Sequence, residues 1–91
     1  MRIIRAASAG TLESSDAYVE IEPTKDGICV QLNSVVMEQF GEAIEQTVRD
    51  VLKEHSVEHA SVRIMDRGAL DCVIRARVET AVLRGGEKTD V

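Results

Sequence analysis

The chain has 91 residues, of which 44% are hydrophobic and only 2% are aromatic, and its formal net charge is −5. This length supports one domain with a single aliphatic core. The acidic balance argues against nucleic-acid binding and against docking on an anionic membrane surface, because both need a basic footprint. It suits protein partners that carry basic docking patches.

No apolar run approaches the roughly 20 residues that a membrane span needs. Residues 1–9 have too short an apolar region for a signal peptide, so we interpret them as a mature N-terminus and expect a cytoplasmic protein. Cys29 and Cys72 both lie within apolar, strand-like patterns. We therefore favour reduced core cysteines over a disulfide.

The first third of the chain has the patterns of strands and turns. Residues 2–7 are expected to form a short edge strand or to lie extended, and residues 8–15 to form a loop. Residues 17–22 alternate apolar and polar side chains, which predicts a half-buried strand. Residues 23–27 contain Pro and Gly as turn residues, and residues 28–33 alternate again. The two strands are predicted to pair as a hairpin.

A long amphipathic helix is predicted after the second strand. Apolar residues recur at intervals of three and four over about eighteen residues. The apolar face comprises Met37, Phe40, Ile44, Val48, Val51, Leu52 and His55. Asn33 or Ser34 is expected to cap the helix, because a short side-chain oxygen accepts an unpaired N–H there.

The last part of the chain is predicted to contain a strand over residues 60–65 and a turn at 66–68. Residues 69–84 are ambiguous: alternation favours a strand from about 71 to 79, whereas Leu70, Ile74, Val78 and Ala81 also fit a helical face. Residues 85–91 are polar and are expected to form a disordered tail outside a domain spanning 1–84. The fold class is therefore α+β, with a mostly antiparallel sheet of about four strands and one long amphipathic helix packed on it.

Three segments carry a family resemblance: residues 10–16 (GTLESSD), 36–41 (VMEQFG) and 66–79 (DRGALDCVIRARVE). They resemble the acyl carrier protein of citrate lyase, the gamma chain of that enzyme. Each motif alone is weak, but the three occur in the family's order and the likeness runs from about residue 8 to 84. The resemblance aligns Ser14 with the serine that the family modifies. Ser15 departs from the pattern, because glycine is common at that position.

The resemblance implies a function as a non-catalytic carrier. It implies a phosphoribosyl-dephospho-coenzyme A group joined to Ser14 by a phosphodiester, whose thiol carries acetyl and citryl groups. The implied partners are the transferase (alpha) and lyase (beta) subunits, a prosthetic-group transferase and an acetylating ligase. An isolated serine is a poor nucleophile, and no histidine lies near Ser14 in the sequence, so the attaching enzyme would supply the base.

Alternatives remain at this point. The chain could be the carrier of a related citramalate lyase or malonate decarboxylase, or an interaction subunit without a cofactor. Ser15 offers a second hydroxyl beside Ser14. Glu13 and Asp16 flank the site, and we hypothesise that their charges hold the arm away from the domain. His55 and His59 lack an evident third ligand for a metal, and no metal site is predicted.

Overall fold

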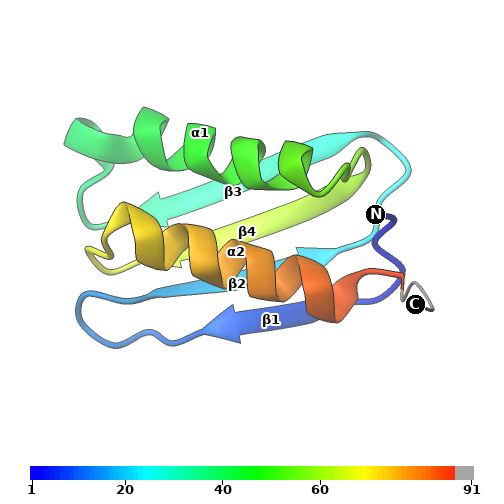
Figure 1. The fold of residues 1–91 in the computed structure, drawn as a ribbon. Coiled ribbons are helices and arrows are strands. Elements are labelled where there is room, and N and C mark those ends of the chain that lie inside the picture. The colour runs from blue at the N-terminus through cyan, green and yellow to red at the C-terminus, as the bar shows by residue number, and fades with distance from the viewer. Residues whose placement is uncertain (88–91) are drawn as a thin grey trace.

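The computed structural model describes residues 1–87, which form four strands and two helices (Figure 1). In chain order these are β1 (Ala7–Gly10), β2 (Ala17–Glu22), β3 (Ile28–Ser34), α1 (Met37–Glu54), β4 (Ala60–Asp66) and α2 (Asp71–Gly85). The α+β class is confirmed, as are the strands predicted near 17–22, 28–33 and 60–65. None of the helices in the described residues is long and apolar enough to cross a bilayer.

The sheet has the strand order β1-β2-β4-β3 and is mixed rather than antiparallel throughout. β2 pairs antiparallel with β1 and with β4, whereas β3 pairs parallel with β4. The predicted hairpin between β2 and β3 is therefore wrong, because β4 lies between them. Alternate residues of β4 are almost fully buried, as expected of a central strand, and α1 supplies the long crossover that parallel pairing of β3 and β4 requires.

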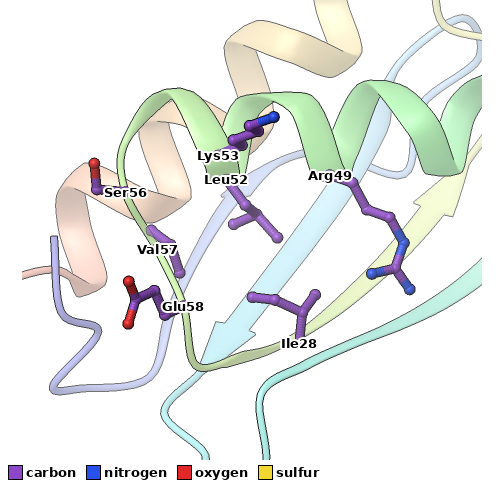
Figure 2. Close-up of a pocket in the computed structure, with 7 residues that line it drawn as sticks. All are labelled: Ile28, Arg49, Leu52, Lys53, Ser56, Val57 and Glu58. Atoms are coloured by element: carbon purple, nitrogen blue, oxygen red, sulfur yellow. The ribbon is translucent and has the colours of Figure 1, made fainter.

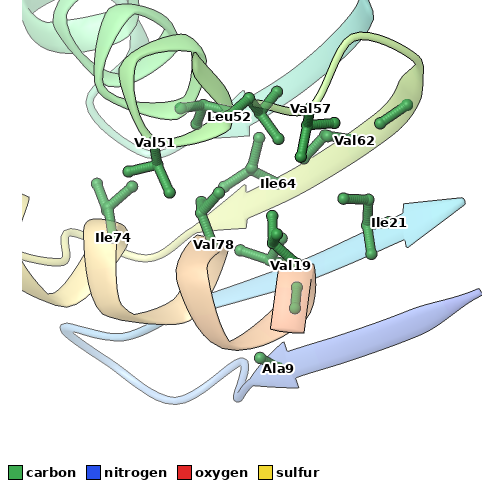
Figure 3. Close-up of a cluster of buried hydrophobic side chains, with 14 of the residues drawn as sticks. Ala9, Val19, Ile21, Val51, Leu52, Val57, Val62, Ile64, Ile74 and Val78 are labelled. Atoms are coloured by element: carbon green, nitrogen blue, oxygen red, sulfur yellow. The ribbon is translucent and has the colours of Figure 1, made fainter. Parts of the chain in front are cut away.

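Both helices cover the same face of the sheet. α2 contacts β1 and β2, α1 contacts β3, and the two helices contact each other. Aliphatic side chains pack between the helices and the sheet (Figure 3). They include Val51 and Leu52 of α1, Ile74 and Val78 of α2, and Val19 and Ile64 of the sheet. All six are at most 2% exposed, so the single aliphatic core predicted from composition is present.

The segment after residue 70 is a helix, so the strand favoured over 71–79 is a wrong prediction. The buried residues of α2 are Ile74, Val78, Ala81, Val82 and Gly85, and they recur at intervals of a helix. Cys72 and Ala76, which completed the apparent alternation, are exposed. The segment covers the part of the sheet face that α1 leaves open. A helix there buries the apolar side chains of α2 against the sheet, so the helix forms and not the strand.

Several boundaries also differ from expectation. The first strand occupies residues 7–10 rather than 2–7, although Ile3 forms an isolated bridge with Gly86. No side chain caps α1; Ser34 Oγ accepts a hydrogen bond from the N–H of Val36, at 3.0 Å, just before the helix. Gly86 of the predicted tail is buried and pairs with Ile3. Residues 88–91 of that tail lie outside the described residues. Cys29 and Cys72 are exposed free thiols and not core residues.

Candidate functional site

Ser14 lies in a tight turn between β1 and β2. The N–H of Asp16 donates to the carbonyl of Glu13 at 3.1 Å, which places Ser14 and Ser15 at the two central positions of the turn. Both serines are exposed. Ser15 has a φ of 65°, in the left-handed region. Glycine adopts this conformation without a steric cost, so Ser15 occupies a backbone position that favours glycine.

The Ser14 turn is anchored to the end of β4. The N–H of Ser15 donates to the carbonyl of Arg67, and the N–H of Arg67 donates to the carbonyl of Asp16, both at 2.9 Å. These bonds continue the β2–β4 ladder beyond its last pair, Ala17 with Asp66. The backbone next to Ser14 is therefore hydrogen-bonded to the residue that follows β4, while the Ser14 side chain itself is exposed.

Asp16 connects the turn to α2. Its carboxylate accepts two hydrogen bonds from the Arg77 guanidinium, at 3.0 and 2.9 Å. It also accepts from the Thr11 hydroxyl at 2.6 Å and from the N–H of Ala17 at 2.7 Å. The Asp16 side chain is only 14% exposed. The Arg77 hydrogen bonds, followed by those of Thr11 and Ala17, hold the pKa of Asp16 well below its usual range.

This lowered pKa predicts how Asp16→Asn changes stability with pH. A carboxylate whose pKa is lower in the folded chain stabilises the fold above its ordinary pKa of 3.8 and loses that effect as the pH falls toward the folded value. We expect Asp16→Asn to lower the free energy of unfolding at pH 7, and the difference from the original chain to shrink steadily below pH 4. Urea unfolding of both proteins at pH 7, 4, 3 and 2 measures this difference.

Glu45→Gln is the matched control for this measurement. Glu45 pairs with Arg49 at 3.0 Å on the open surface of α1, and both side chains are more than 40% exposed. Exposed pairs of this kind contribute little to stability, so the control is expected to unfold almost like the original chain at pH 7. An Asp16→Asn variant whose deficit stayed constant from pH 7 to pH 2 would contradict the proposed linkage.

The arginines at the end of β4 and on α2 have different partners. Arg75 donates to Glu54 and joins α2 to the end of α1, whereas Arg77 is held by Asp16. Arg67 forms no side-chain ion pair within residues 1–87 and lies beside the Ser14 turn. The charge of Asp16 is thus compensated by Arg77, whereas Glu13, on the other side of the two serines, forms no ion pair within residues 1–87.

The two histidines are remote from Ser14. His55 follows the last residue of α1 and lies 3.6 Å from Glu79, and His59 Nδ1 accepts a hydrogen bond from the N–H of Gly27. Figure 1 places the end of α1 at the opposite end of the molecule from the loop between β1 and β2. Ser14 therefore has no histidine base in reach among the described residues.

A pocket of about 390 Å³ lies at that opposite end (Figure 2). Its walls come from the last turns of α1, the following turn and the start of β3. The lining residues are Ile28, Arg49, Leu52, Lys53, Ser56, Val57 and Glu58. These side chains do not assemble a nucleophile with a base, and the pocket carries no catalytic arrangement.

Comparison with known proteins identifies the family. A family model described as malonate decarboxylase delta subunit (MdcD) matches residues 4–85. The citrate lyase acyl carrier protein 2 of Salmonella typhimurium is 51% identical over 92 residues, covering 100% of this chain and 95% of that protein. The chain belongs to the citrate lyase acyl carrier protein family. Another member, from Rhodopseudomonas palustris, is 54% identical over 84 residues and covers 92% of this chain and 87% of its own length.

A solved structure shares the fold of this citrate lyase acyl carrier family member. It is a chain of a Pseudomonas malonate decarboxylase hetero-tetramer in complex with malonate, with a TM-score of 0.78 and 21% sequence identity. The match covers 94% of this chain and 93% of that one. At this identity the likeness speaks for the fold alone. The family expected from the three sequence motifs is confirmed.

Proposed function

We propose that this chain is the acyl carrier subunit of a citrate lyase, and that Ser14 carries its prosthetic group covalently. Membership of the family supports the carrier role. The observation that carries the assignment of Ser14 is its position: an exposed hydroxyl in a turn whose backbone is tied to the β2–β4 ladder. Such an anchor leaves a long arm free to move while its base stays in place. A tether of this kind raises the effective concentration of the acyl group at each active site.

The surroundings of Ser14 suit an anchor and not a catalytic nucleophile. A serine nucleophile needs a base within hydrogen-bond reach. Asp16, two residues from Ser14, is a half-buried carboxylate, but Arg77, Thr11 and the Ala17 N–H already donate hydrogen bonds to its oxygens. Its lowered pKa also makes it a poor proton acceptor at neutral pH. The base for the attachment reaction therefore comes from the attaching enzyme.

The proposed group is phosphoribosyl-dephospho-coenzyme A, joined to the Ser14 oxygen as a phosphodiester. The residues present fit such a group, because the hydroxyl is exposed and the neighbouring Asp16 is compensated by Arg77. The exposed Arg67 adds a positive charge beside the turn. When attached, the group supplies a thiol that holds acyl groups as thioesters; this chain positions the anchor and performs no bond cleavage itself.

The proposed partners follow from this role. They are the transferase (alpha) subunit, which exchanges acetyl for citrate, and the lyase (beta) subunit, which cleaves the citryl thioester. A prosthetic-group transferase would attach the arm, and an acetylating ligase would charge it. We place this cycle in the cytoplasm. A carrier role in a malonate decarboxylase is the second candidate, favoured by the description of the matching family model. The 51% identity to a named citrate lyase carrier favours the first.

Intact-mass measurement on the protein from its native host, grown on citrate, tests the attachment. We expect the original chain to show the added mass of the prosthetic group and Ser14→Ala to show only the mass of the bare chain. Ser15→Ala is the matched control, because it removes the neighbouring hydroxyl of the same turn and is expected to keep the added mass.

Two outcomes would contradict the proposal in different ways. Added mass that survives in Ser14→Ala and disappears in Ser15→Ala would move the site by one residue. An original chain of bare mass, isolated from cells that show citrate lyase activity, would reject the covalent arm altogether.

A further inference from the structure

Four large apolar side chains are exposed around the start of the two helices. Val35, Met37, Phe40 and Leu70 have exposed fractions of 64%, 48%, 55% and 70%. The first three flank or lie in the first turn of α1, and Leu70 immediately precedes α2. We call these four residues the end patch. Exposed apolar side chains gathered in this way mark interaction surfaces more often than scattered ones do.

The end patch borders an apolar groove between the two helices. The groove has a volume of about 360 Å³, and its lining includes the exposed Phe40 and Leu70 and the buried Ile44 and Ile74. The only charged residue in its lining is Asp71, whose carboxylate already accepts a hydrogen bond from Thr47. The groove can therefore receive a large apolar side chain without leaving a buried charge unpaired.

Backbone contacts connect the groove to the Ser14 turn. Ser15 and Asp16 hydrogen-bond to Arg67, and the next residue, Gly68, lines the groove. A Cβ placed on Gly68 would lie 4.0 Å from Cγ2 of Val35. Figure 1 shows the β1–β2 loop, the start of α1 and the start of α2 at the same end of the molecule. A protein that encloses Ser14 therefore also approaches the end patch.

Acidic side chains at this end determine which charge a protein bound at the end patch should carry. Glu13, Glu38 and Glu42 are exposed, and none of them takes part in an ion pair within residues 1–87. A basic surface would be attracted to them, and a second copy of this acidic chain, docked by the same patch, would bring like charges together. Arg67 is also exposed at this end, but three carboxylates outnumber its one positive charge, so the charge favours a basic partner over self-association.

We infer that the end patch is the docking surface for the catalytic subunits that act on the arm. Each subunit inserts an apolar side chain into the groove and places Lys or Arg side chains opposite the three glutamates. This inference rests on the proposed carrier function. Buried apolar anchors at the centre of an interface contribute most of its affinity, whereas rim charges mainly set the association rate.

Binding to the purified transferase and lyase subunits of the same host tests the docking surface. We expect Phe40→Ser and Leu70→Ser each to weaken the Kd for both subunits by about tenfold or more. Leu83→Ser is the matched control: Leu83 is 54% exposed near the end of α2, away from the patch, and its loss should leave the Kd within about twofold. Glu38→Gln combined with Glu42→Gln should slow association at low salt and weaken its salt dependence.

Circular dichroism and thermal unfolding confirm that each variant is folded, and because the substituted side chains are exposed, Tm should change little. Unchanged Kd values for Phe40→Ser and Leu70→Ser, together with an unchanged association rate for the glutamate variant, would overturn the inference. A dimer of the original chain that Phe40→Ser converts to monomer, with subunit binding intact, would overturn it in favour of a second copy.

Intact mass of the same native-host preparations separates this inference from the proposed function. If the original chain carries the arm and binds its subunits, and the patch variants bind them equally well, only the docking surface is overturned. An original chain without added mass overturns the carrier assignment, whatever its binding.

Discussion

Gly10→Ala is expected to lower the free energy of unfolding by about 3 kcal/mol. Gly10 ends β1 with a φ of 96°, a conformation that side-chain-bearing residues rarely adopt. A Cβ at this position would lie 1.9 Å from the carbonyl oxygen of Ala17 and 3.1 Å from Cδ of Arg77. The clash with Ala17 is with backbone, so β1 and β2 must separate where they hold the Ser14 turn. Urea unfolding measures the loss.

Gly27→Ala is the control that isolates this contact. Gly27 has a φ of 81°, yet no atom lies within 4 Å of the position its Cβ would take. Its substitution carries only the cost of the left-handed conformation, about 1 kcal/mol. Equal losses in the two variants would show that the backbone of β1 and β2 relaxes around the new methyl group, which would contradict the expected rigidity of the loop.

Asp66→Ala is expected to have a comparable effect, about 3 kcal/mol, because it removes a buried hydrogen-bond acceptor. Asp66 is the last residue of β4 and is 2% exposed. Its carboxylate accepts from the Ser34 hydroxyl at 2.7 Å and from the N–H of Ala69 at 2.9 Å. The substitution leaves both donors without their partner, and it loosens the segment whose next residue, Arg67, holds the Ser14 turn.

Two further substitutions are controls for Asp66→Ala. Asp66→Asn keeps the volume and one acceptor oxygen, so its loss should be about half as large. Asp26→Ala removes an exposed carboxylate from the turn before β3, and we expect a change within about 0.5 kcal/mol. An Asp66→Ala protein as stable as Asp26→Ala would mean that the hydrogen bonds of Asp66 contribute nothing net to the fold.

The sequence alone located the elements whose burial follows a regular period. Alternation predicted β2, β3 and β4, and the three-to-four spacing predicted α1 almost to its bounds, because these patterns report which side of a local element is buried. The motif around Ser14 indicates the family without reference to the fold. The match at residues 10–16 depends on residue types in order and needs no knowledge of the fold.

Only the tertiary structure decided how these elements meet. Alternation shows that a strand has a buried face but not which strand lies beside it, so the placement of β4 between β2 and β3 was missed. The sequence of α2 fitted both the two-residue period of a strand and the period of a helix. The helix formed because α1 leaves open a part of the sheet face that α2 covers. The pairing of Asp16 with Arg77 joins residues 61 positions apart. No local pattern encodes such a contact, because it forms only when α2 packs on the sheet face beside the β1–β2 turn.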